Sequence, residues 1–78
     1  MRFYEAGDYE NSIKAARDAI KIKPDYDPAY NNICSAYNML KQWDKAIEAG
    51  KKAVELNPNN QLAKNNLAWA QSQDKTNK

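Results

Sequence analysis

One feature restricts the fold of this 78-residue chain more than any other: the sequence matches itself at an offset of 34 residues. Pro24 falls on Pro58 at this offset, and the residues around the two prolines match as well. A fixed period of this length is typical of stacked helical or strand-helix units, so we expect a repeat protein. The matching small and apolar pairs are Ile13/Ile47, Ala19/Ala53, Ile20/Val54, Ile33/Leu67 and Ala36/Ala70.

Each half of the repeat is predicted to be a helix, because small and apolar residues recur three and four positions apart. Asp27 followed by Pro28 provides an N-cap and a first helical residue, while Pro24 and Pro58 end the preceding helices. We therefore predict an all-α chain with helices at about 8–22, 28–40, 43–56 and 61–73, packed as successive antiparallel neighbours. The residues expected in the core are Ile13, Ile33, Ala46, Ile47, Ala53 and Leu67.

The complete repeat carries a recognisable set of small and aromatic residues, namely Ala29-Tyr30, Ile33-Cys34, Tyr37, Ala46, Ala53 and Pro58. This set resembles the tetratricopeptide-repeat (TPR) family, whose second helix ends at a proline. The resemblance implies an α-solenoid of antiparallel helical hairpins, here about four helices. An RNA-reading cousin of this fold has a repeat one residue longer, so the spacing disfavours it.

Three positions depart from the family pattern. Gly50 and Ala16 stand where the family often has a large aromatic residue, so we expect thin packing near Gly50. Lys41 replaces the glycine that usually closes the turn between the two helices, whereas Gly7 keeps it in the first copy. We therefore expect the turn at Lys41 to be strained or differently shaped.

The chain is predicted to form a single segment, 1–78, that samples three copies of the repeat. We divide it into the second half of a repeat at 3–26, a complete repeat at 27–60, a C-terminal capping helix at 61–73 and a polar tail at 74–78. Lys64 and Gln71 replace Tyr30 and Tyr37 on the surface that would receive another hairpin, which predicts that Lys78 lies at or near a natural C-terminus.

The N-terminal end shows the opposite pattern, because Phe3 and Tyr4 look like the last turn of a longer helix. Either further repeats precede them or a second copy of the chain covers the apolar surface. We expect self-association through Phe3, Ile13 and the apolar face of helix 28–40.

The first helix of each TPR hairpin lines the concave side of the solenoid, and the resemblance therefore places the polar face of helices 28–40 and 61–73 in a peptide-binding groove. The Asn-Asn pair at 31–32 recurs at 65–66, and it resembles the asparagine ladder that holds peptide main chain in the TPR arrays of protein O-glycosyltransferases. The alternative is that these asparagines are ordinary exposed polar residues. The predicted groove residues are Asn31, Asn32, Ser35, Asn38, Met39, Asn65, Asn66, Trp69 and Gln73.

Trp69 could anchor a partner or pack within the chain. The groove face offers no lysine or arginine at the places where chaperone-binding TPR proteins hold a C-terminal carboxylate. The partner is therefore expected to be an internal extended segment.

The composition argues against catalysis and metal binding. The chain has no histidine, and its one cysteine, Cys34, has no base to activate it, so we predict no catalytic residue, no metal site, no cofactor and no enzyme activity. A net charge of +2 without long runs of like charge argues against nucleic-acid or direct membrane contact. No apolar stretch approaches the roughly 20 residues that cross a bilayer, and no signal peptide is seen. The compartment stays undetermined for this predicted soluble segment, with the cytoplasm favoured.

We therefore interpret the chain as a protein–protein interaction module that binds an extended peptide and acts as a scaffold. Two alternatives stay open: a substrate-recruiting, non-catalytic part of a larger enzyme such as a glycosyltransferase, and a self-associating structural unit.

Overall fold

The computed structural model describes residues 6–76, with side chains at 8–74. These residues form four α-helices: α1 (Ala6–Ile22), α2 (Asp27–Met39), α3 (Trp43–Leu56) and α4 (Gln61–Thr76). Within 6–76 there is no strand, so the predicted all-α class is confirmed. The predicted boundaries are correct to within about two residues except at the end of α4, which continues three residues beyond position 73. None of these four helices is long and apolar enough to span a bilayer.

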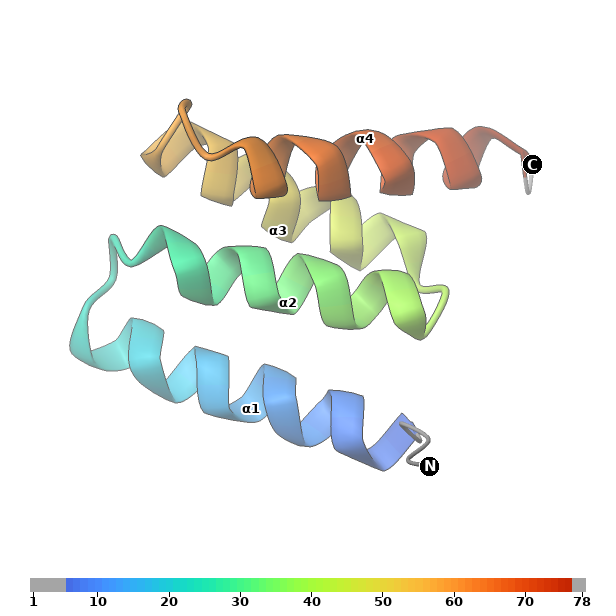
Figure 1. Ribbon diagram of the computed structural model, residues 1–78. Helices are drawn as coiled ribbons and strands as arrows, with labels where there is room; N and C mark the ends of the chain where they lie inside the picture. The colour runs from blue at the N-terminus through green and yellow to red at the C-terminus, as the bar shows by residue number, and fades with distance from the viewer. Residues whose placement is uncertain (1–5, 77–78) are drawn as a thin grey trace.

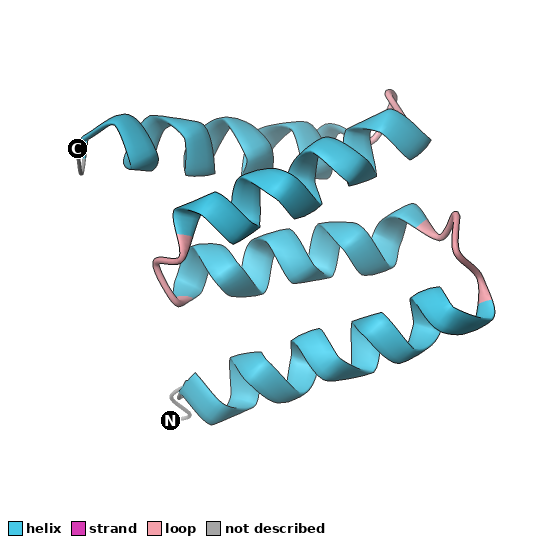
Figure 2. Ribbon diagram, turned by 180° about the vertical axis from the view of Figure 1, so that it is seen from behind, coloured by secondary structure: helices cyan, strands magenta, loops and turns pink. Residues whose placement is uncertain are grey.

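The helices follow one another as antiparallel neighbours joined by short turns (Figure 1). α2 is central because it packs against α1, α3 and α4. Among the described helices α1 packs against α2 alone, whereas α4 contacts both α2 and α3. The view from behind shows α1 at one edge of the stack and α4 at the other (Figure 2). The arrangement therefore has two sides, one formed by α2 and α4 and the other by α1 and α3.

The core is built mainly from alanines, which lets the helices approach closely. Four of the residues expected in the core, Ile13, Ile33, Ala46 and Ala53, are buried. Ile47 and Leu67 were also expected there, but they are only partly buried at its edge. The other buried apolar residues are Ala16, Ala29, Cys34, Ala36, Tyr37, Ala49, Ala63 and Ala70.

The role predicted for Asp27 is wrong. The N-cap of α2 is Tyr26, and Asp27 already lies in the first turn of the helix. Its Oδ2 accepts hydrogen bonds from Asn60 Nδ2 at 2.9 Å and Asn57 Nδ2 at 3.5 Å. Asp27 therefore ties the start of α2 to the turn between α3 and α4, a contact that local sequence cannot reveal. In that same turn the side-chain oxygen of Asn60 caps α4 by accepting from the N–H of Ala63 at 3.1 Å.

Lys41 and Gly7 occupy equivalent positions in two copies of the repeat, but their backbone conformations differ. Lys41 has a φ of 62°, a left-handed conformation that costs a side-chain-bearing residue energy, which confirms the expected strain. Gly7, by contrast, was expected to close a turn but lies inside α1. Its backbone is helical there, so the position does not require the left-handed conformation that favours glycine.

The expectation of thin packing at Gly50 is wrong. Gly50 is buried, and a Cβ built on it would lie 3.0 Å from Leu67 Cβ and 3.1 Å from Cys34 Sγ. The missing side chain is therefore compensated by a closer approach of α4 to α3. The sulfur of Cys34 fills part of the remaining space from α2.

Two of the three sites that were expected to mediate self-association are covered within one chain. Ile13 is only 5% exposed, and Ala29, Ile33 and Ala36 on the apolar face of α2 are buried within one chain. α1 covers this face by packing directly on α2. Phe3 lies outside the described residues, so self-association through the chain end stays a prediction.

Candidate functional site

The polar face of α2 and α4 brings together the residues that the sequence placed in a groove. α2 and α4 pack against each other, and helical spacing puts positions 31, 35, 38 and 39 of α2 on the side shared with positions 65, 66, 69 and 73 of α4. We call this surface the amide face. Its members are Asn31, Asn32, Ser35, Asn38, Met39, Asn65, Asn66, Trp69 and Gln73.

Three of these asparagines bond to one another across the two helices. Asn66 Nδ2 donates to Asn31 Oδ1 at 2.8 Å, and Asn38 Nδ2 donates to the main-chain oxygen of Asn66 at 3.1 Å. Asn66 is equivalent to Asn32 in the repeat, yet its partner is Asn31, which lies 35 residues earlier in the chain. The recurring Asn-Asn pair therefore links successive repeats, a role that the ladder interpretation missed.

Asn38 is the clearest correction to the predicted groove, because it is only 7% exposed. Its Nδ2 also lies 3.9 Å from Cys34 Sγ, and its Oδ1 is buried without a hydrogen-bond partner among the described residues. Helical spacing alone assigned Asn38 to the exposed face. The close approach of α4 covers it, so Asn38 positions α4 and does not face solvent.

Cys34 lies beside Asn38 and is completely buried. Desolvation raises the pKa of its thiol to about 11. The thiol is therefore protonated at neutral pH, and a protonated, inaccessible sulfur is neither a nucleophile nor a metal ligand. Within the described residues no group of three or more histidine, cysteine or acidic side chains is placed to hold a metal ion.

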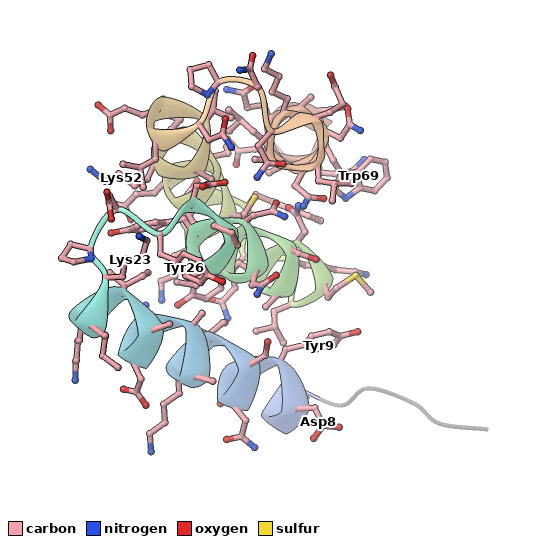
Figure 3. All side chains as sticks on the ribbon, turned by 60° about the vertical axis from the view of Figure 1, so that its left-hand side comes forward. Asp8, Tyr9, Lys23, Tyr26, Lys52 and Trp69 are labelled. Carbon is pink, nitrogen blue, oxygen red and sulfur yellow. The ribbon has the colours of Figure 1, made fainter. Side chains whose placement is uncertain are left out.

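The remaining members of the amide face reach solvent. Trp69 is 54% exposed and Met39 is 59% exposed. Asn65 is also exposed and accepts a hydrogen bond from Gln61 Nε2 at 3.0 Å on its own helix. Figure 3 shows Trp69 projecting from α4 away from the body of the molecule. Packing within the chain therefore covers less than half of this side chain.

A small pocket of about 240 Å³ extends the amide face toward α1. Asn32 and Ser35 of α2 line it together with Asp8, Tyr9 and Ser12 of α1. In Figure 3 Tyr9 and Trp69 lie on the same side of the molecule. The three α1 residues were missed from the sequence, although the antiparallel α1–α2 hairpin places the start of α1 beside the end of α2.

Two family models, both described as tetratricopeptide repeat, match residues 28–60 and 3–26 and together cover most of the chain. The search of curated proteins finds no significant match.

Proposed function

The chain belongs to the tetratricopeptide-repeat family, whose members mediate protein–protein interaction and are typically non-catalytic, and we propose that it binds an extended peptide across its amide face. The observation that carries this proposal is that the asparagines fall into two groups, one bonded between the helices and one exposed. Asn31, Asn38 and Asn66 are joined across the helices, which leaves Asn32 and Asn65 exposed on a fixed framework.

The exposed groups have the chemistry that an extended peptide requires. An asparagine side chain can donate to a main-chain carbonyl and accept from a main-chain N–H at the same time. Trp69 and Met39 add exposed apolar surface beside them, and tryptophan is enriched among residues that dominate binding energy. The amide face therefore offers main-chain contacts from its asparagines and side-chain contacts from Trp69 and Met39.

The absence of cations among the members of the amide face narrows the class of peptide. All nine members are uncharged, and the neighbouring pocket adds one acid, Asp8. A terminal carboxylate would meet no compensating charge there. The proposed ligand is therefore an internal, extended and largely neutral segment of another protein, which suits a scaffold and equally a substrate-recruiting part of a larger enzyme.

The experiment starts by selecting peptides from a random phage-displayed library against the whole chain. The most enriched peptide is then titrated against the parent and against the double variant Asn32→Ala/Asn65→Ala. We expect weaker binding, since each lost hydrogen bond costs about 0.5–1.5 kcal/mol. Trp69→Ala should weaken it further.

The matched control is Asn11→Ala/Asn59→Ala, which removes two exposed asparagines that neither belong to the amide face nor line the neighbouring pocket. This control should bind the peptide like the parent. Equal binding by the parent and by Asn32→Ala/Asn65→Ala, with both variants folded by circular dichroism, would contradict the proposal.

A further inference from the structure

A second surface lies on the side opposite the amide face, between α1 and α3. Both helices pack on α2, but they do not pack on each other. The space between them is a groove of about 770 Å³ that runs over α2. In Figure 3 Lys52 of α3 lies on the opposite side of the molecule from Trp69.

The floor of this groove is apolar and largely aromatic. α2 supplies Tyr30, Ile33 and Tyr37, while α1 and α3 supply Ile20 and Ala49. Tyr30 and Ile20 are only half-buried, so part of this apolar surface is open to a partner. A long apolar floor between two helices is the surface on which a third, amphipathic helix can lay its apolar face.

The rim of the groove is rich in cations. Arg17, Lys45, Lys51 and Lys52 line it, against two acids, Glu48 and Glu55. One of the acids is already engaged, because Lys52 Nζ lies 3.4 Å from Glu55 Oε1. All six charged side chains are exposed, and the rim therefore carries an excess of two positive charges.

Tyr37 holds two of these cations in place. Its hydroxyl accepts a hydrogen bond from Arg17 Nη2 at 2.9 Å, across the α1–α2 contact. Lys45 Nζ lies 5.7 Å from the centroid of its ring, within the range of a cation–π contact. One aromatic side chain therefore positions a cation from each wall of the groove.

We propose that this cationic groove is a docking site for an amphipathic, acid-flanked helix of a partner protein. The apolar floor fits the apolar stripe of such a helix, and the four cations fit acidic residues on its flanks. A second copy of this chain is a poorer match, since its own formal net charge is +2. The inference is independent of the peptide site on the amide face and adds a second partner surface.

The test uses a panel of synthetic helical peptides of about 18 residues, or five turns. Each has leucines along one face and glutamates on its flanks. In one set of control peptides lysine replaces every glutamate, and in another serine replaces every leucine. Binding is followed by two-dimensional NMR of the whole, isotopically labelled chain. We expect leucine–glutamate peptides to shift the amide signals of Arg17, Ile20, Ala49 and Lys52, and both control sets to bind at least about tenfold more weakly.

Two charge-reversed variants separate the groove from general charge attraction. Lys51→Glu/Lys52→Glu reverses the rim, and Lys21→Glu/Lys64→Glu makes the same change in net charge on exposed lysines that do not line the groove. The two are also matched in the pairs they break, because Lys21 pairs with Asp18 as Lys52 pairs with Glu55. Only the rim variant should lose affinity, by about tenfold or more.

Three results would overturn the proposal. The first is that no leucine–glutamate peptide shifts the groove signals. The second is that both charge-reversed variants, folded by circular dichroism, weaken binding equally. The third is that the groove signals shift with protein concentration alone and sedimentation shows a dimer, which would assign the groove to a second copy.

Discussion

The amide face and the cationic groove share one helix and differ in almost every other respect. α2 presents Asn31, Asn32 and Ser35 to one side, and Tyr30, Ile33 and Tyr37 to the other. The first surface is uncharged and amide-rich, whereas the second is aromatic beneath a rim of cations. A single helix, half a repeat long, can therefore carry two unrelated binding chemistries, because its period of 3.6 residues separates them.

The two regions are also held together differently. The amide face depends on close packing beneath it, where Gly50 and Cys34 let α4 approach and Asn38 bonds to Asn66. The cationic groove depends on α1 and α3 staying apart, and Arg17 and Tyr37 link α1 to α2. Changes beneath α4 should therefore disturb one region and spare the other.

Gly50→Phe should have the largest effect and tests whether the amide face can be disrupted alone. The new side chain would meet Leu67 Cβ and Cys34 Sγ at once, so we expect the free energy of unfolding to fall by about 3 kcal/mol. Urea denaturation measures it. NMR signals of Asn31 and Asn66 should shift more than that of Arg17.

The control combines Gly50→Phe with Cys34→Ala. The sulfur of Cys34 is one of the three closest contacts at Gly50, and alanine removes it, so this change should restore part of the lost stability. A Gly50→Phe chain as stable as the parent would mean that α4 does not sit tightly on α3.

Alkaline pH should also lower the free energy of unfolding, through the buried thiol of Cys34 beneath the amide face. The Cys34 thiol has a pKa of about 11 when folded and its usual 9.0 when unfolded. Between these values the folded state binds more protons than the unfolded state, so stability falls as the pH rises. The full shift corresponds to about 2–3 kcal/mol lost from pH 9 to 11.

Other groups also titrate in this range, and the comparison must therefore be made with Cys34→Ala. Ala68 occupies the equivalent position of the next repeat, so alanine is a natural replacement. The measurement is urea denaturation of both chains at several pH values from 8 to 11. A parallel loss of stability in the two chains would remove Cys34 as the cause.

The hydrogen bond between Asn31 and Asn66 should make a smaller contribution. A double-mutant cycle with Asn31→Ala and Asn66→Ala should give a coupling of about 0.5–1.5 kcal/mol in the free energy of unfolding. The control cycle uses Gln61 and Asn65, which bond within α4 at the surface, and it should give only about 0.2–0.5 kcal/mol. Equal couplings would show that the amide link does not join the repeats.

Lys41→Gly should have the smallest effect, and of opposite sign. Glycine removes the left-handed strain of about 1–2 kcal/mol but loses more conformational entropy on folding. We expect a net stabilisation of about 0.5–1 kcal/mol, read from thermal denaturation. Lys41→Ala keeps the strain and should not stabilise. Lys41 lines neither the amide face nor the cationic groove, so partner binding at both should stay unchanged.

The helices, four of the six expected core residues and the turn at Lys41 could be predicted because each depends on residues close in sequence or on the 34-residue period. The roles of Asp27 and Asn38 could not, since each bonds to a residue 28 or more positions away. The packing at Gly50 depends on how far α4 moves inward, which no local pattern reports. The cationic groove was missed for a similar reason. Its floor and rim come from three helices.

Among the described helices α1 packs on α2 alone, and this determines the order in which the helices open. In a stack held by nearest-neighbour contacts, the helix with fewest neighbours is released first. Amide hydrogens of α1 should therefore exchange with solvent sooner than those of α2, which is enclosed by the other three helices. One wall of the cationic groove is thus the most easily released helix of the four. The width of that groove can change through the movement of α1 while the amide face keeps its shape.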